Sequence, residues 1–347
     1  MRLTENPEYL AQLRAIKGLA FLSGKRLLVT GAAGMLGSCL VDAVMLWNRE
    51  HSQPCQIAAV GRSGKKLAER FQDYLGDSCF QYIQQDVCQP LKGFPEQADY
   101  IIHAASNADP ANMAKYPVDT LLANVMGTDN LLQYGLSHRM KRFLFVSSGE
   151  VYGQPDWKED SFTEASCGPL DLFNPRSCYP EGKRAAEVLC QSYASQYGAD
   201  VVMVRPCHLF GPTMSRRDSR AAAEFLWSAA EGRELVLKSD GRKERSHCYV
   251  VDAAAALLLV LAQGGAGEAY NIADRRYQMT IGDFARTAAE AGGCKAVFAV
   301  PQERAASHSA PERQVLDSGK LEALGWKPGE DGGAIGRTVK LLREAGT

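Results

Sequence analysis

The 347-residue sequence lacks the paired and clustered patterns that mark several classes of protein. Its ten cysteines include no Cys-x-x-Cys pair and no His/Cys cluster at metal-ligand spacing, so we expect reduced thiols, no bound metal and a cytoplasmic protein. Residues 1–20 carry mixed charge and no unbroken apolar segment, which does not fit a signal peptide. The longest apolar stretch, residues 253–262, is too short to cross a membrane and predicts a buried helix.

The sequence also lacks an excess of either charge. Lysine and arginine total 39 and aspartate and glutamate total 40, which gives a formal net charge of −1. A nucleic-acid-binding surface normally carries a strong basic bias, so we expect no nucleic-acid partner. Any anionic ligand must then be held by a few placed cations, while the 46% hydrophobic content supplies a large core.

Short apolar segments alternate with helix-like segments through the first two thirds of the chain. The expected strands are 25–30, 56–61, 80–87, 100–106, 142–148 and 201–206, and helices are expected over 121–135 and 181–197. This alternation predicts an α/β fold with a doubly wound parallel sheet, a Rossmann domain over residues 23–206. Residues 1–22 are expected to form a helical extension, and 207–347 a smaller substrate-binding lobe, parts of which can return to the first domain.

A glycine-rich turn follows the first expected strand. The run "TGAAGMLG" fits G-x-x-G-x-x-G, with Gly31, Gly34 and Gly37 between a strand and a helix, and Met35 and Leu36 between the last two glycines. Glycines there allow a tight turn and close approach of the backbone to a pyrophosphate, and the helix N-terminus favours its negative charge. The pattern therefore predicts a dinucleotide site.

The second expected strand ends in "VGRSGKK" and has no Asp or Glu to bind a ribose 2′-hydroxyl. Arg62 can instead meet a 2′-phosphate, which leaves the cofactor as NAD or NADP; it can equally be an ordinary surface residue. Asp86, in "QDV", is placed for the adenine amino group or for a strand-end cap.

The run "SCYPEGKRAAE" places Tyr179 and Lys183 four residues apart, on one face of a helix. An ammonium group beside a phenol stabilises the phenolate and lowers the tyrosine pKa, which would make a general acid/base. Such a pair also arises by chance in long chains, so the motif needs the support of others.

Together with the glycine turn, the motifs "HAAS", "VSSGEVYG", "SCYPEGKRAAE" and "RPCHLFGP" occur in the order of a known family. The chain resembles the extended short-chain dehydrogenases/reductases that act on nucleotide sugars, the NAD-dependent epimerase/dehydratase family. Within it, "NPRSCYPEGKRAAE" and "RSHCYVVDA" look most like UDP-glucuronate decarboxylases.

The resemblance implies oxidation of a sugar hydroxyl at C4, which enables a second step on a nucleotide-diphosphate sugar. Tyr179 would take the C4 hydroxyl proton, Lys183 would hold the nicotinamide ribose and lower the tyrosine pKa, and Ser148 would bond the reacting oxygen. The full set of implied cofactor contacts is Gly31, Gly34, Met35, Leu36, Gly37, Arg62, Asp86, Val87, Ala104, Ala105, Ser106, Asn124, Tyr179, Lys183 and Pro206.

The second step is left open by the stretch "SSGEVYG". Dehydratases acting on dTDP-glucose carry an Asp-Glu pair where this chain has Gly149 and Glu150. Gly149 cannot supply an acid, so dehydration of that type is weakened, and Glu150 argues mildly against simple 4-epimerisation. Decarboxylation of a C4-oxidised uronic acid needs less from the protein and is preferred, with Glu150 included among the catalytic residues.

The substrate side shows one departure from the family. His208 stands where relatives usually have an asparagine that contacts the substrate near its diphosphate, which leaves substrate identity in doubt. Arg220, Arg245 and Arg313 are the candidate cations for the diphosphate. By analogy a homodimer is expected through the two long helices, and a cofactor sensor without chemistry is a remote alternative because the Tyr/Lys pair is retained.

Overall fold

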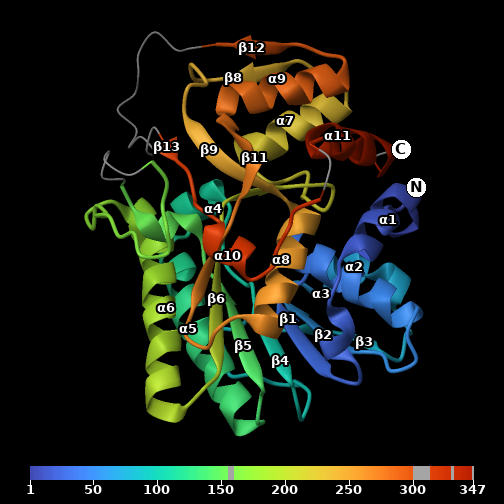
Figure 1. Cartoon of the computed structure of the whole chain (residues 1–347), viewed down its shortest axis with the longest axis vertical. Helices are drawn as coiled ribbons and strands as arrows, with labels where there is room; N and C mark the ends of the chain where they lie inside the picture. Colours follow the sequence, from blue (N-terminus) through green and yellow to red (C-terminus); the bar gives the residue numbers. More distant parts are fainter. Residues whose placement is uncertain (155–159, 300–312, 330–331, 346–347) are drawn as a thin grey trace.

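The computed structural model describes residues 1–154, 160–299, 313–329 and 332–345, and its main feature is one parallel sheet (Figure 1). The sheet contains β1 (Arg26–Thr30), β2 (Gln56–Gly61), β3 (Phe80–Gln84), β4 (Tyr100–His103), β5 (Arg142–Val146), β6 (Val201–Pro206) and β10 (Ala269–Ile272). Their order is β10-β6-β5-β4-β1-β2-β3, with every neighbouring pair parallel. The order reverses between β1 and β4, as in a doubly wound fold, so the predicted fold class is confirmed.

Helices cover both faces of this sheet (Figure 1). On one face lie α2 (Met35–Arg49) and α8 (Val250–Gln263), and on the other lie α5 (Pro117–Ser137) and α6 (Cys178–Tyr197). Alternate residues of β1 separate accordingly, because Leu27 and Val29 belong to the core on the α2 side and Leu28 to the core on the α5 side. Burial on both faces explains why the strands read as continuous apolar runs. Three shorter helices complete this half: α3 (Gly64–Arg70) follows β2, η3 (Gln72–Tyr74) follows α3, and α4 (Pro110–Lys115) follows β4.

The second lobe is built around β9 (Glu244–Tyr249). This strand pairs in parallel with β7 (His208–Phe210) and β13 (Arg313–Gln314), and antiparallel with β11 (Asp274–Thr280). The lobe also holds a two-stranded sheet of β8 (Leu235–Leu237) and β12 (Ala296–Phe298), with α7 (Ala221–Ala230), α9 (Ile281–Gly292) and α11 (Ala334–Ala345). The chain returns to the main sheet as β10, beside α10 (Gly319–Ala323), and then leaves it again as β11. The domain boundaries inferred from the sequence stay a prediction.

The N-terminal residues form η1 (Leu3–Glu5), α1 (Pro7–Ala15) and η2 (Leu19–Leu22) and contact both lobes. Tyr9 is fully buried and donates to Asp42 of α2 at 2.9 Å. On the other side, Lys340 of α11 bonds Glu8 at 2.7 Å. The extension therefore joins the Rossmann half to the end of the second lobe (Figure 1).

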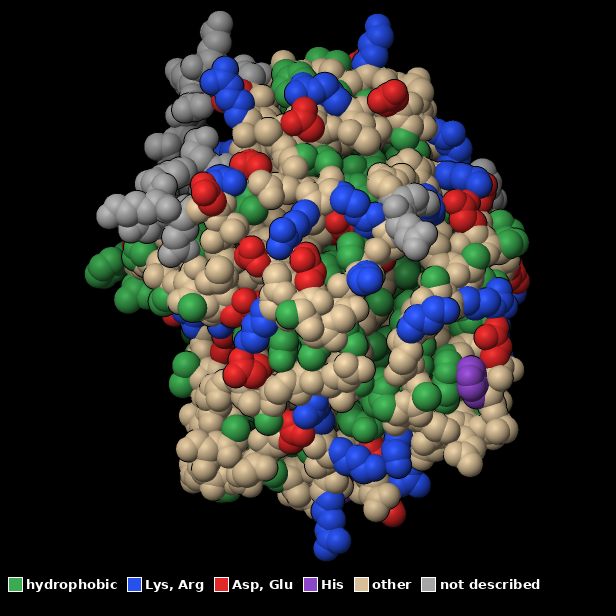
Figure 2. Space-filling view, viewed as in Figure 1, with side chains coloured by type: hydrophobic (Ala, Val, Ile, Leu, Met, Phe, Trp, Pro, Cys, Tyr) green, Lys and Arg blue, Asp and Glu red, His purple; other side chains and the backbone are tan. Residues whose placement is uncertain are grey.

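Charged side chains of both signs are mixed over the face drawn in Figure 2. None of the ten cysteines, all within the described ranges, forms a disulfide. Among the described residues, no helix is both long and apolar enough to cross a membrane, and no group of His, Cys, Asp and Glu side chains could hold a metal.

Candidate active site

A cavity of about 2300 Å³ runs along the carboxyl ends of the main-sheet strands and under the second lobe. Its wall includes the residues that directly follow β1, β2, β4 and β5, namely Gly31, Arg62, Ala104 and Ser147. Ligands of open α/β sheets bind at this edge, near the point where the strand order reverses. The cavity therefore lies where the fold predicts a ligand site.

The glycine turn between β1 and α2 leaves no room for a side chain at Gly31 or Gly37. Gly31 has φ +66°, and a Cβ atom there would lie 2.6 Å from the carbonyl oxygen of Ala104. A Cβ atom on Gly37 would lie 2.6 Å from the carbonyl oxygen of Gly31. Gly34 is the N-cap of α2, and Met35 and Leu36 begin that helix and line the cavity. The helix N-terminus thus opens onto the cavity, where it favours an anionic group.

The other predicted cofactor contacts extend from this turn along the cavity wall. Arg62, after β2, donates to Asn107 at 2.7 Å. Asp86 and Val87 follow β3, and the Asp86 carboxylate also accepts the backbone N–H of Cys88 at 3.0 Å. Ala104, Ala105 and Ser106 follow β4, and Pro206 ends β6.

These residues fit a dinucleotide on the evidence of the cavity itself. The glycine cradle would be filled by any Cβ atom, and the buried hydroxyl of Ser106 in the cavity wall has no hydrogen-bond partner in the described chain. A buried polar group without a partner is costly unless a ligand or water satisfies it.

Asn124 is the one predicted cofactor contact that does not line the cavity. It lies fully buried in α5, where its amide nitrogen donates to the carbonyl of Thr120 at 2.8 Å. The same nitrogen would be 3.2 Å from a Cβ atom on Gly182 of α6. In this position Asn124 packs between α5 and α6, against Gly182.

Tyr179 and Lys183 share the cavity-facing side of α6, as predicted from their spacing. The Lys183 ammonium donates to the carbonyl of Val146 at 2.7 Å and lies 5.9 Å from the centroid of the Tyr179 ring. It also lies 4.6 Å from the Phe145 ring centroid. Tyr179 is 6% exposed and Lys183 is 2% exposed, so both are held by packing.

The pKa values of this pair correct one sequence-based expectation. Lys183 was expected to lower the pKa of Tyr179, but burial, followed by the negative charge of Glu150, raises it to about 12. The nearby Ser148 hydroxyl and the cations Arg220 and Arg176 act in the opposite direction without overcoming burial. Burial also lowers the pKa of Lys183 to about 7, which weakens the charge that was expected to help the phenol.

Ser148 and Glu150 lie near Tyr179, Ser148 as the N-cap of the short helix η4 (Gly149–Tyr152) and Glu150 within it. The Ser148 hydroxyl caps this helix by accepting the Glu150 backbone N–H at 3.2 Å. The Glu150 carboxylate is paired with Arg176, whose terminal nitrogen donates to its two oxygens at 2.9 and 2.8 Å. The Arg176 guanidinium also lies 6.0 Å from the centroid of the Tyr179 ring. Serine, tyrosine and an arginine-bound carboxylate therefore meet at one point of the cavity.

The far end of the cavity carries basic side chains from the second lobe. Arg220 precedes α7 and bonds the carboxylate of Asp218 at 2.9 and 3.0 Å, and Arg245, in β9, is 3% exposed. His208, in β7, lines the cavity and its side chain is exposed there. Arg313 does not line the cavity; it bonds Glu244 at 2.9 Å.

Two residues of the site were missed in the sequence. Arg176 stands three positions before Tyr179, so the helical spacing that identified Lys183 also pointed to it. His247 lies within the quoted "RSHCYVVDA" motif, but only the pairing of β7 with β9 places it beside His208.

Fold and site together define a Rossmann protein with a nucleotide-cofactor cavity, and comparison with known proteins gives the family. The protein-family model for the "NAD dependent epimerase/dehydratase family" matches residues 27–273 of this sequence. UDP-glucuronic acid decarboxylase 1 of Xenopus tropicalis is 32% identical over 315 residues, which cover 90% of this chain and 70% of that protein. UDP-glucuronic acid decarboxylase 6 of Arabidopsis thaliana is 34% identical over 314 residues, covering 89% and 85%.

Solved structures agree with this assignment. The dTDP-glucose 4,6-dehydratase of Streptomyces venezuelae, with NAD and TYD bound, has a TM-score of 0.76 at 26% identity and covers 92% of this chain and 97% of its own. The UDP-glucuronic acid 4-epimerase of Bacillus cereus, in complex with UDP-glucuronic acid and NAD, has the same fold, with a TM-score of 0.73 at 21% identity over 92% and 98%. The chain belongs to the NAD-dependent epimerase/dehydratase family of enzymes, and within it is a nucleotide-sugar-modifying enzyme.

Proposed function

We propose that this enzyme oxidises the C4 hydroxyl of a nucleotide-diphosphate sugar and then decarboxylates it, as a UDP-glucuronate decarboxylase does. The observation that carries the proposal is the meeting of Ser148, Glu150, Tyr179 and Lys183 at one point of the cavity. Supporting it, curated relatives at 32% and 34% identity are named UDP-glucuronic acid decarboxylases. Tyr179 takes the C4 hydroxyl proton, Ser148 bonds the same oxygen, and Lys183 holds the cofactor ribose. A bound nicotinamide cofactor supplies the hydride acceptor at C4.

Two features favour decarboxylation as the second step. Gly149 supplies no acid of the dehydratase type, and a Cβ atom there would lie 3.0 and 3.1 Å from the methyl groups of Leu316, which would have to shift by a few tenths of an ångström. Glu150, the remaining carboxylate, is held by Arg176 and so is suited to orienting the sugar. A sugar with a 4-ketone and a C6 carboxylate is a β-keto acid, which loses CO2 readily and needs no further proton abstraction from carbon.

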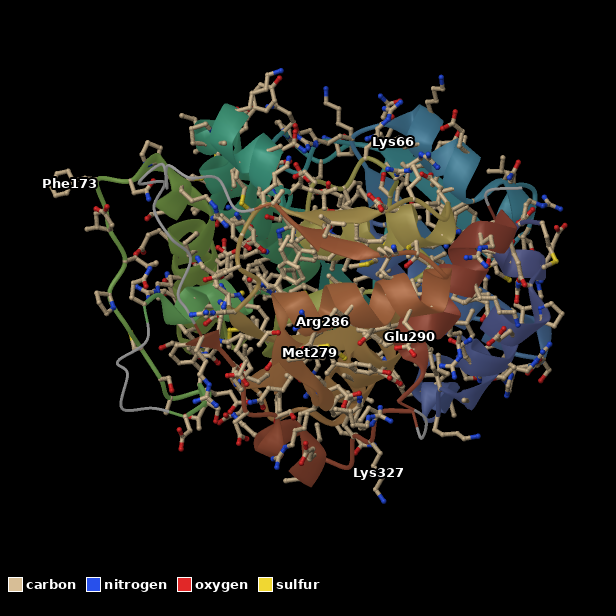
Figure 3. The ribbon with its side chains drawn as sticks, turned by 90° about the horizontal axis from the view of Figure 1, so that it is seen from above. Lys66, Phe173, Met279, Arg286, Glu290 and Lys327 are labelled. Carbon is tan, nitrogen blue, oxygen red and sulfur yellow. The ribbon has the colours of Figure 1, made fainter. Side chains whose placement is uncertain are left out.

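The cofactor is NAD or NADP, and the wall of the cavity after β2 leaves NADP open. Arg62, Ser63 and Lys66 line this part, and no acidic residue stands at the end of β2. Figure 3 shows Lys66 on α3, on the side of the molecule away from Phe173. Arginine and lysine here suit a 2′-phosphate better than a bare 2′-hydroxyl.

Dehydration of the dTDP-glucose type is the second candidate, because a solved dehydratase is 26% identical. The enzyme should be incubated with UDP-glucuronate, dTDP-glucose and UDP-glucose, and the products weighed by mass spectrometry. Loss of CO2 supports the proposal, loss of water supports dehydration, and a product of unchanged mass that separates from the substrate by chromatography supports 4-epimerisation.

Glu150→Gln separates the two candidates at the level of mechanism. Under decarboxylation it slows turnover of the acidic sugar but leaves reduced-cofactor formation in place. Under dehydration it removes the C5 base, so solvent-hydrogen exchange at C5 stops and the 4-keto sugar accumulates. Decarboxylation itself adds one solvent hydrogen at C5 where CO2 leaves, so the diagnostic signal is loss of the substrate's own C5 hydrogen to solvent. That loss in the unmodified enzyme and its absence in the variant would replace decarboxylation with dehydration.

We also infer a homodimer through α5 and α6, which pack against each other. Val118, Leu121, Leu122 and Met126 of α5 and Val188 of α6 are between 37% and 65% exposed, an unusual apolar content for a solvated helix pair. Sedimentation velocity of the full chain and of a Val188→Glu variant tests this, since the charge should shift the variant toward the monomer. The cytoplasmic location expected from the sequence stays a prediction.

A further inference from the structure

Two histidines stand side by side in the wall of the cavity, at its basic end. His208 of β7 and His247 of β9 are direct partners in the parallel register of these strands. Their rings meet edge to face, with centroids 5.8 Å apart and planes at 89°. Both line the cavity, and neither has a role in the chemistry proposed at Tyr179.

The hydrogen bonds of the two rings define where protons can add. Nδ1 of His247 lies 3.1 Å from the carbonyl oxygen of Tyr277, and a carbonyl can only accept, so Nδ1 carries a proton. A second proton must therefore add at Nε2, on the side of the ring away from Tyr277. Stacking on Phe284, at 4.7 Å and 29°, fixes the plane of this ring. In the described chain, His208 makes no hydrogen bond through its ring.

The charges that face the two rings are mostly positive. Arg245 of β9 and Arg220, ahead of α7, lie close enough to repel a proton from His208, and Arg245 acts on His247 in the same way. The carboxylates on the surrounding elements already have cationic partners: Asp218 is bonded by Arg220, Glu244 by Arg313 and Asp274 by Arg276. Burial together with Arg245 lowers the pKa of His247 to about 4. His208 is open to the cavity, and there partial desolvation by the cavity walls, followed by His247 and these cations, lowers its pKa below the ordinary value.

We propose that His208 and His247 form a proton-coupled binding site for the diphosphate of the nucleotide sugar, so that binding takes up a proton from the solvent. The proposal rests on the nucleotide-sugar substrate proposed above. A dianion placed among Arg220, Arg245 and the two imidazoles reverses the local field and favours an imidazolium, which then donates a charge-assisted hydrogen bond. The proton returns to the solvent when the product leaves.

The sign of the pH dependence follows from linkage. Each histidine has a lower pKa in the free protein and a higher pKa in the complex. At pH values between these two, the complex holds more protons than the free protein, so affinity falls as pH rises through this window. For uptake of one proton, the dissociation constant rises by up to about tenfold per pH unit. The arginines keep their charge throughout this window and so contribute no such slope.

The test is calorimetric titration of the full-length Tyr179→Phe variant, which binds without turnover. UDP-glucose is the probe, because its diphosphate has no ionisable proton between roughly pH 5.5 and 8, and two buffers of different ionisation enthalpy report the protons exchanged. We expect uptake of about one proton near pH 6.5. His208→Asn and His247→Gln, which retain a hydrogen-bond donor but cannot titrate, should each reduce the uptake and flatten the pH dependence.

His138→Gln is the matched control. His138 also bonds a backbone carbonyl, that of Tyr134, at 2.8 Å and stacks on an aromatic ring at 4.3 Å, but it lies outside the cavity. This variant should keep the full proton uptake. Binding of UDP-glucose without uptake, or uptake unchanged in both cavity variants, overturns the inference and leaves the proposed function intact.

Two further outcomes are also decisive. If UDP-glucuronate, UDP-glucose, dTDP-glucose and GDP-mannose all fail to bind, the proposed function itself is contradicted, and the ligand of this site with it. If His247→Gln does not fold, His208→Asn decides alone, because His208 makes no ring hydrogen bond in the described chain that its replacement could break.

Discussion

At the cofactor end of the cavity, the wall follows the order of the sequence, because each segment begins where a strand of the main sheet ends. The glycine turn follows β1, Arg62 follows β2 and Ala104 follows β4. At the substrate end, the wall is assembled from β7, β9 and the start of α7, which belong to a different lobe and a different sheet. The first end is thus specified by local motifs, and the second by long-range pairing of strands.

The point where the two ends meet carries the largest expected effect. Tyr179→Phe removes only the ionisable oxygen, so sugar oxidation should fall by a factor on the order of 10² to 10⁴ while the cofactor still binds. Cofactor binding can be followed by fluorescence and oxidation by the absorbance of the reduced nicotinamide. A variant with near-normal turnover would remove Tyr179 from the chemistry.

The second prediction is that the buried ammonium of Lys183, at the cofactor end, binds the cofactor but lowers the stability of the cofactor-free protein. Because its pKa drops from 10.5 to about 7 in the fold, folding is penalised below about pH 7, and the penalty fades as pH rises toward 10.5. Lys183→Met should therefore raise the free energy of unfolding of the cofactor-free protein at neutral pH, by on the order of 2 kcal/mol after the lost bond to Val146 is counted.

Urea unfolding of this variant between about pH 6 and 9 measures the effect, and cofactor titration should show weakened binding. A variant less stable than the parent at every pH would contradict the stated penalty. Lys183→Arg, which keeps a charge that cannot be lost, is the matched control and should not gain stability.

The third prediction concerns Arg176, whose pairing with Glu150 affects the pKa of Tyr179 where the two ends of the cavity meet. With Arg176 replaced by methionine, the Glu150 charge beside Tyr179 is no longer compensated, so the pKa of Tyr179 rises further. The acid limb of the pH–rate profile should then move upward by about one unit, a loss of about tenfold at neutral pH. Arg176→Lys should shift the profile less, and adding Glu150→Gln to Arg176→Met should move the limb back. An unchanged profile would reduce Arg176 to a structural residue.

The smallest effect is expected at the outer part of the cofactor end. Arg62→Ala should weaken NADP binding by up to about tenfold and leave NAD binding nearly unchanged, since only NADP has a 2′-phosphate for the guanidinium. Titration of the two cofactors against Arg62→Ala, with Lys92→Ala outside the cavity as the control, gives the comparison. Equal losses for both cofactors would remove the preference for the 2′-phosphate.

The same contrast explains how much the sequence could predict. The parallel sheet and the glycine turn were predictable because continuous apolar strands and close backbone contacts leave local patterns. The raised pKa of Tyr179 could not be predicted, because it depends on how deeply the phenol is buried in the fold and not on its spacing to Lys183. Arg313 was assigned to the diphosphate from its motif, but the pairing of β13 with β9 places it against Glu244, away from the cavity wall.

The return of the chain to the main sheet as β10 has a consequence for how this enzyme can change its substrate. Between β9 and β11, both in the lobe, the polypeptide contributes a strand to the edge of the cofactor-binding sheet. No single junction therefore separates the two halves, and the lobe cannot be exchanged as one cassette between relatives. New specificity has to come by replacing side chains within a shared framework, which makes paired positions such as those of β7 and β9 the natural places for divergence.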